Sequence, residues 1–206
     1  MWRLLRARMF CRLLCRCSED RSLTFAAPLE VHVHKRSGIL ERMRYLITFS
    51  CYGTRVHGEG IGLVDKHHNR YGSPYLNPNP NRALAERERM DQPAYLLDHV
   101  RRAIVLTSLQ ETCRFRNWLL LAAHLRTNHV HIVVEANLGP EKVMSDLKAY
   151  ASRALNAASL DLPDRKRWTR HGSTRWLWKD QAVRDAIKYV VEGQGETLAV
   201  YCIEAD

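Results

Sequence analysis

The sequence lacks long apolar runs, and this absence excludes one broad class of protein. The longest nearly uninterrupted stretch covers residues 118–123 of the 206-residue chain, whereas a membrane-spanning helix needs about 18 apolar residues. Cysteine is also sparse, since six residues are too few for a disulfide scaffold in a chain of this length. We therefore expect no integral membrane protein, but a reduced, cytoplasmic protein with small buried thiols.

Acidic residues are scarce relative to basic ones. The chain has 22 Asp and Glu against 32 Lys and Arg, which gives a net charge of +10. Such an excess favours a polyanionic partner, with nucleic acid ahead of a membrane surface. The hydrophobic fraction of 46% and charged fraction of 26% are ordinary for a globular protein. At this length we expect about one domain.

Several well-defined catalytic and metal-binding motifs are missing. No H-E-x-x-H, G-x-S-x-G or Walker-type loop occurs. Cys11, Cys15 and Cys17 cluster, but their spacing is not the paired C-x2-C of structural zinc sites. A histidine-triad hydrolase needs a third alternating histidine where Val133 stands, and H-x-T phosphodiesterases need a threonine where His131 stands. These classes are therefore excluded.

Residues 1–42 differ in composition from the rest of the chain. They carry nine Lys and Arg against four acids, so a fifth of the chain holds half of the net charge. Arginines interrupt the apolar residues too often for a signal-peptide core. An amphipathic basic helix from Trp2 to Arg16 is one interpretation, but we expect a poorly ordered extension, because untethered termini are usually disordered. The remaining residues 43–206 then form the folded domain.

The pattern after residue 43 predicts an α+β fold. Residues 45–52, 118–124 and 129–136 are rich in β-branched, aromatic or aliphatic residues and are typical of strands. Apolar residues recur with helical spacing over residues 93–114, 139–156 and 180–192. Residues 57–92 carry loop signals and no role that we can assign. This order predicts a mainly antiparallel sheet covered by helices.

A candidate metal site lies within residues 129–136. Because side chains alternate along a strand, His129 and His131 point to the same face and can chelate one divalent metal ion. A pair of surface histidines is the equally weighted alternative, because H-x-H is a short and frequent pattern. The chain itself contains such a pair at His32 and His34, which we interpret as chance.

Two tyrosines downstream are candidates for a nucleophile. A metal ion polarises a phosphodiester, and a tyrosine hydroxyl can then attack it to form a phosphotyrosine. Tyr150 falls in the middle of one predicted helix and Tyr189 on the flank of the last one. The alternative for each is an ordinary amphipathic tyrosine with its hydroxyl in water.

Four segments together resemble a known family. They are YLITFSCYGTRVHGEG, NWLLLAAHLRTNHVHIVVEA, LKAYASRALN and RHGSTRWLWKDQAVRDAIKYVVEGQGE. In this order they are similar to the single-tyrosine HUH transposases, that is, the insertion-sequence 200-like enzymes and in particular the REP-associated tyrosine transposases. The resemblance covers about residues 43–199.

The resemblance implies a function and a site. The metal-binding pair corresponds to His129 and His131, and the nucleophile corresponds to Tyr189 rather than Tyr150. The implied activity is Mg²⁺- or Mn²⁺-dependent cleavage and rejoining of single-stranded DNA, often beside a hairpin, through a 5′-phosphotyrosine and a free 3′-OH. A ferredoxin-like sheet and, frequently, a homodimer are implied as well. Imidazole and amide ligands favour Mn²⁺ over Mg²⁺.

One position departs from the family pattern. Members commonly carry a Gln or Asn metal ligand four residues after the tyrosine, where this chain has Gly193. Gln194 can replace it only if the helix ends or distorts at Gly193, and Glu192 is the other candidate; we favour Gln194. If neither binds metal, the chain is a DNA-binding protein that retains the fold without catalysis. A metal-dependent phosphodiesterase that uses water is the third alternative, and it would not need Tyr189.

Residues 161–179 interleave cations with indoles, as proteins that bind single strands do. We expect at least one of Trp176 and Trp178 to lie in the core. Phosphate contacts are expected from the cations of this segment and of the preceding helix: Arg165, Lys166, Arg167, Arg170, Lys148 and Arg153.

Overall fold

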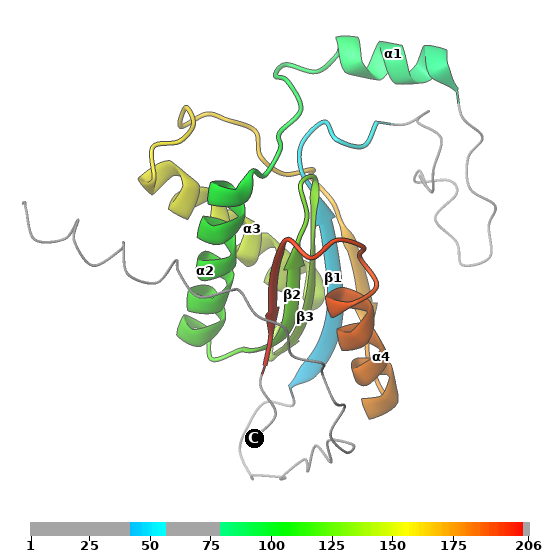
Figure 1. Cartoon of the computed structure of the whole chain (residues 1–206), viewed down its shortest axis with the longest axis vertical. Coiled ribbons are helices and arrows are strands. Elements are labelled where there is room, and N and C mark those ends of the chain that lie inside the picture. Colours follow the sequence, from blue (N-terminus) through cyan, green and yellow to red (C-terminus); the bar gives the residue numbers. More distant parts are fainter. Residues whose placement is uncertain (1–41, 57–78, 204–206) are drawn as a thin grey trace, which may run out of the picture. The chain divides into compact units, whose positions relative to one another are not determined.

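A computed structural model describes residues 42–56 and 79–203 of the chain (Figure 1). Except for Arg42, the predicted N-terminal extension lies outside the described residues, together with its cysteine cluster and the pair His32 and His34. Most of the predicted loop over residues 57–92 also lies outside them. Within the described part of the chain, no helix has the length and apolar character needed to cross a membrane.

The described residues fold around a single antiparallel sheet. Its strands are β1 (Met43–Ser50), β2 (Leu119–Leu125), β3 (His129–Ala136), β4 (Ser173–Trp176) and β5 (Ala199–Cys202). They lie in the order β4-β1-β3-β2-β5, and every neighbouring pair is antiparallel. The first four strands have the order of a ferredoxin-like sheet, with β5 added beside β2. The predicted α+β fold with a mainly antiparallel sheet is confirmed.

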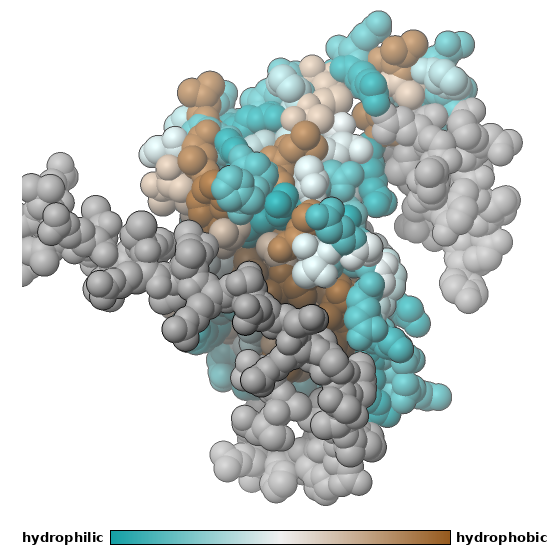
Figure 2. All heavy atoms as spheres, in the orientation of Figure 1, coloured by the Kyte–Doolittle hydropathy of each residue, from teal (hydrophilic) through white to brown (hydrophobic). Residues whose placement is uncertain are grey.

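Helices cover both faces of this sheet. The helices that do so are α2 (His99–Phe115), α3 (Pro140–Ala157) and α4 (Asp180–Val191); α1 (Pro80–Glu88) precedes them in the chain. α2 and α3 pack on one face, over a core that includes Ile47, Phe49 and Ile132. α4 packs on the opposite face, where Val183 and Val190 join a smaller cluster. Figure 1 shows the two helix layers on either side of the strands, and Figure 2 shows hydrophilic residues along the outer side of α4.

Four elements differ from the sequence-based prediction. α1 lies within the predicted loop, and the short edge strands β4 and β5 were not expected. The helix predicted to start at residue 93 begins only at His99, because residues 93–98 lie in neither a helix nor a strand. In that segment the backbone N–H of Tyr95 donates to Tyr52 and that of Leu97 donates to Thr127, and both side chains are buried.

The cysteines follow the expectation in part. Cys51 and Cys113 are free thiols buried in the larger core, and burial raises the pKa of each to about 12. Cys202 is exposed, since it lies near the end of the edge strand β5. The expectation of buried thiols is therefore wrong for this residue.

Candidate active site

The two histidines of β3 lie on the face of the sheet that α4 covers. Their neighbour Val133, which shares their side of the strand, packs in the α4 cluster. The strand register places His131 between Thr48 of β1 and His124 of β2. The ring centroids of His129 and His131 are 4.7 Å apart, so alternation along the strand brings the two imidazoles together as expected.

Each imidazole is oriented through its Nδ1 atom. Nδ1 of His129 lies 2.6 Å from Oδ1 of Asn128, and Nδ1 of His131 lies 2.8 Å from Oγ1 of Thr48. Because the Asn128 carbonyl oxygen can only accept, the proton of His129 lies on Nδ1. The Thr48 hydroxyl can accept from Nδ1 of His131 in the same tautomer, since a hydroxyl serves as either donor or acceptor. Both Nε2 atoms then keep their lone pairs, which is the arrangement of metal-binding histidines.

The environment keeps both rings neutral. Burial lowers the pKa of His129 to about 4, and the charges of Arg55 and Arg126 act in the same direction. Burial lowers the pKa of His131 to about 3, assisted by the neighbouring His129. The side chain of Gln194 interacts with both rings and opposes these shifts. Neutral imidazoles are the form that a metal ion requires.

Tyr189 of α4 contacts this pair. Its ring lies edge-on to His131, with centroids 5.6 Å apart. Tyr189 is 48% exposed, so this residue can be reached from solvent. Tyr150 instead lies on α3 across the sheet, where it contacts Phe115 and Arg153. Of the two candidate nucleophiles, only Tyr189 lies near the histidines.

The end of α4 brings Gln194 to the histidines. The helix ends at Val191, so the condition on which Gln194 could approach the site is met. Its Nε2 donates to the backbone carbonyl of Tyr189 over 3.1 Å, which leaves Oε1 as the amide atom available to a ligand. Glu192 is the exposed C-cap of the helix, and no contact joins it to the histidines.

Gly193 packs against Tyr189 more closely than a residue with a Cβ atom could without a shift of the backbone. A Cβ atom at this position would lie 2.7 Å from the Tyr189 carbonyl oxygen and 3.1 Å from Cδ2 of its ring. The backbone N–H of Gly193 donates to the same carbonyl over 3.0 Å. The glycine at the expected ligand position therefore allows the chain to turn closely over the tyrosine.

The donor set fits a divalent metal ion. Nε2 of His131 is buried and has no hydrogen-bond partner, which is costly unless a ligand takes its lone pair. His124 is unavailable as a ligand, because its two ring nitrogens bind the carbonyl of Val190 and the N–H of Leu198. Among residues 42–56 and 79–203, no group of three or more His, Cys, Asp and Glu side chains could hold a metal. A site here thus needs the amide of Gln194 or groups from substrate and water.

Two of the six cations expected to contact phosphates are buried. Arg167 is 4% exposed and pairs with Asp161 over 3.3 Å. Nζ of Lys148 donates to the carbonyls of Thr169 and His171, and burial lowers its pKa to about 8. Both side chains therefore bind partners inside the protein and stabilise its fold.

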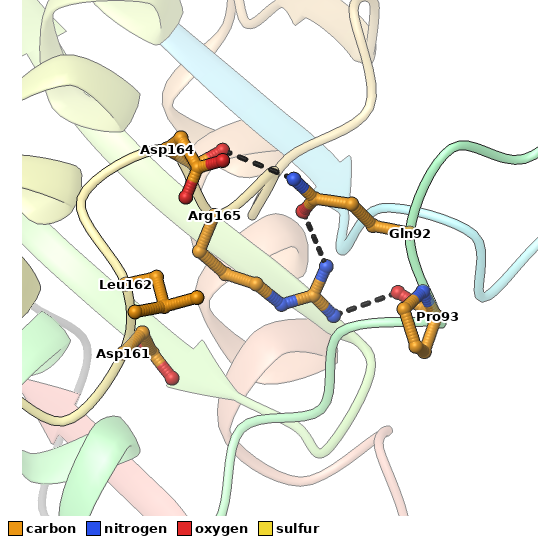
Figure 3. Close-up of a pocket in the computed structure, with 6 residues that line it drawn as sticks. All are labelled: Gln92, Pro93, Asp161, Leu162, Asp164 and Arg165. Atoms are coloured by element: carbon orange, nitrogen blue, oxygen red, sulfur yellow. Dashed lines mark hydrogen bonds between the residues drawn. The ribbon is translucent and has the colours of Figure 1, made fainter.

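Two further cations connect the loop before α2 to the segment after α3. Arg165 donates to Gln92 and to the carbonyls of Pro93 and Ala94, and Lys166 forms an ion pair with Asp91. Figure 3 shows Arg165 at the wall of a small pocket that contains none of the histidines. These contacts occupy the guanidinium of Arg165.

The last two cations are open to solvent. Arg170 forms no ion pair with any described residue, and Arg153 stacks over the ring of Tyr150 with its guanidinium carbon 4.9 Å from the centroid. Trp176 and Trp178 are also open, at 39% and 68% exposed. The expectation that one of these indoles lies in the core is wrong, because β4 is an edge strand and Leu177 between them takes the buried position.

Sequence reasoning missed the groups that surround the histidines. Thr48 and Asn128 orient the rings, and Arg55 places a positive charge near both. The hydroxyl of Thr54 donates to Cys51 and Asn128, which holds the start of the loop after β1 against the turn before His129. Only Asn128, adjacent to His129, carries a signal in the sequence, because the other contacts depend on strand pairing.

These observations define an α+β protein with a histidine pair beside a tyrosine on the last helix. The family model described as "Transposase IS200 like" matches residues 94–190, just under half of the chain. The match includes His129, His131 and Tyr189, and it confirms that the chain resembles the IS200-like transposases.

Two solved structures are similar to this chain. One is a REP-associated tyrosine transposase bound to a REP hairpin, at 9% sequence identity and a TM-score of 0.41, over 78% of this chain and 72% of that chain. The other is a protein from Deinococcus radiodurans R1 assigned as a candidate transposase, at 16% identity and a TM-score of 0.39, over 78% of this chain and 97% of that chain. A comparison with curated proteins gives no match.

Proposed function

We propose that this protein cleaves and rejoins single-stranded DNA with Tyr189 as nucleophile and a divalent metal ion, in DNA transposition. The observation that carries the proposal is the position of Tyr189. The centroid of its ring lies 5.6 Å from that of His131, and the residue is half exposed. A nucleophile beside a metal site must be reachable by a polymer substrate, and this tyrosine is. In this proposal, the catalytic unit is the domain over residues 43–206.

His129, His131 and Gln194 hold the metal ion in this proposal. The free Nε2 lone pairs and the amide oxygen are an N,N,O donor set that suits Mn²⁺ better than Mg²⁺, although either ion can be bound. The bound ion supplies Lewis-acid polarisation of the scissile phosphodiester. Asn128 holds His129 in the required tautomer, and the Thr48 hydroxyl orients the ring of His131.

The reaction exchanges one phosphodiester for another. The Tyr189 hydroxyl attacks the phosphorus, its proton passes to solvent, and a bond forms between the phenolic oxygen and the phosphorus. The bond from phosphorus to the 3′-oxygen breaks, and this oxygen takes up a proton to become a free 3′-OH. Because the energy of the original bond is kept in the phosphotyrosine, the reverse attack by a 3′-OH rejoins a strand.

Exposed cations position the DNA in this proposal. Arg170 and Arg153 are the open members of the expected set, and Lys166 is exposed while paired with Asp91. Arg55 adds a positive charge at the histidine pair itself. The buried Arg167 and Lys148 and the occupied Arg165 support the segment that presents these side chains.

The test is the formation of a covalent protein–DNA adduct. Labelled single strands from the flanks of the gene, with their hairpins, are incubated with the full chain and Mn²⁺ or Mg²⁺ and resolved on a denaturing gel. We expect an adduct that disappears with a chelator. Binding of the strands without an adduct would instead support a DNA-binding protein that has lost catalysis, and hydrolysis without an adduct would support the use of water.

A further inference from the structure

We infer that Trp176 and Trp178 form a platform on which an unpaired nucleobase of the bound DNA stacks. The two indoles are stacked on each other, with centroids 5.0 Å apart and an interplanar angle of 8°. Trp178 is 68% exposed, so its outer face is open. This inference rests on the proposed function, because it requires that the protein bind single-stranded DNA.

The platform is held rigidly by its neighbours. Trp176 packs edge-on against Tyr45, with ring centroids 4.9 Å apart, and the Tyr45 hydroxyl donates to the carbonyl of Leu138. Between the two indoles, Leu177 is buried in the α4 cluster, and its N–H donates to Arg44. An aromatic surface fixed in this way loses little conformational entropy when a base stacks on it.

The charges around the platform favour a polyanion. Arg175 and Lys179 flank the indoles, are exposed and form no ion pair within the described part of the chain. The nearby carboxylates are occupied, since Asp180 pairs with Arg44 and Glu141 accepts a hydrogen bond from Thr174. Aromatic stacking combined with free cations is the arrangement by which proteins hold single-stranded nucleic acid.

The size of the surface argues for a base rather than a protein. A stable protein interface buries about 1,000 Å² or more, whereas two partly exposed indoles offer only a fraction of that area. β4 also joins the platform to the candidate active site, because Ser173 pairs with Thr48 at its other end. Trp176 faces the same side of the sheet as Tyr45, opposite to the histidines, so a DNA strand leaving the site passes around this edge, over about 10 Å of strand, to reach the platform.

The experiment compares two DNA probes and three variants of the full chain. The probes are a labelled hairpin with a single-stranded oligothymidine extension and the same hairpin with a blunt end. We expect Trp178→Ala to weaken binding of the extended hairpin about 5- to 150-fold, as the loss of one stacked base would. Binding of the blunt hairpin should not change. Trp178→Phe should retain most of the affinity, and Phe115→Ala, which removes an exposed aromatic ring from α2, should retain all of it.

Each other result overturns the inference in a recognisable way. Unchanged affinity of Trp178→Ala for the extended hairpin would show that no base stacks on Trp178. Equal weakening for both probes shows that the indoles do not contact an unpaired base. A changed sedimentation coefficient of the free protein assigns the indoles to an interface between two copies. If the wild-type chain binds neither probe, the proposed function fails as well, whereas absence of a covalent adduct would leave the platform intact.

Discussion

Thr48 of β1 lies directly opposite His131 of β3, and its hydroxyl is 2.8 Å from Nδ1 of that imidazole. Thr48→Val keeps the shape of the side chain but removes the hydroxyl that orients the imidazole through Nδ1. We expect this variant to bind Mn²⁺ about 10- to 100-fold more weakly, as other losses of such partners do. Isothermal titration calorimetry of the full chain measures this affinity.

Ser173→Ala is the matched control for Thr48→Val. Ser173 pairs with Thr48 on the neighbouring edge strand, and its hydroxyl has no partner among the described residues. The control should bind Mn²⁺ as the wild type does. Equal Mn²⁺ affinity in Thr48→Val and the wild type would mean that His131 does not need the Thr48 hydroxyl in order to bind the metal ion.

Gly193→Ala should slow adduct formation. The new Cβ would lie 2.7 Å from the Tyr189 carbonyl oxygen, so the end of α4 and the tyrosine ring must shift. We expect a loss of about 10- to 100-fold in the single-turnover rate, because displacements of about 1 Å have such effects. Gly139→Ala is the control, since nothing lies within 4 Å of its Cβ. Equal rates in the two variants would contradict the inference that a Cβ atom at residue 193 displaces Tyr189.

The buried Lys148 makes stability depend on pH. Burial lowers its pKa from 10.5 to about 8 in the folded protein. Between about pH 8 and 10.5 the unfolded chain therefore binds more protons at this residue, so its contribution to the free energy of unfolding rises with pH. Below pH 8 this contribution is a constant penalty.

Urea unfolding across this pH range tests the Lys148 effect. Lys148→Met should lack the rise, while Lys179→Met, which changes an exposed lysine, should keep it. The difference between the two variants isolates Lys148 from the tyrosines and thiols that titrate nearby. Parallel curves for both variants would show that Lys148 has an ordinary pKa.

Arg170 should contribute one phosphate contact. If it contacts phosphate, Arg170→Ala weakens binding of any strand and lowers the slope of log affinity against log salt by about 1. Fluorescence anisotropy at several salt concentrations measures this slope. Arg114→Ala, an exposed arginine of α2, should leave the slope unchanged. A slope that Arg170→Ala does not alter would place the DNA elsewhere.

Local patterns were enough to predict the central strands and the long helices. β3 begins and ends where its apolar run predicted, α3 is shifted by one residue at each end, and α4 ends one residue earlier than predicted. β4 and β5 have four residues each and are held by pairing with distant strands. Short edge strands carry little periodicity of their own, so the sequence alone does not reveal them.

The site divides in the same way between local and distant contacts. The histidine pair follows from strand alternation, and its approach to Tyr189 agrees with the family resemblance. The partnership of Thr48 with His131 depends on a strand register that joins residues 83 positions apart. The burial of Arg167 depends on Asp161 and on the packing of a loop, whereas a run of cations in a sequence normally indicates an exposed surface.

The covalent adduct tests the central claim most directly. Wild type, Tyr189→Phe and Tyr150→Phe are incubated with labelled single strands and Mn²⁺ and resolved on a denaturing gel. Tyr189 is half exposed and its hydroxyl has no hydrogen-bond partner among the described residues, so its replacement should leave the fold intact. We predict an adduct in the wild type and in Tyr150→Phe and none in Tyr189→Phe. An adduct that persists in Tyr189→Phe would contradict the assignment of Tyr189 as the nucleophile.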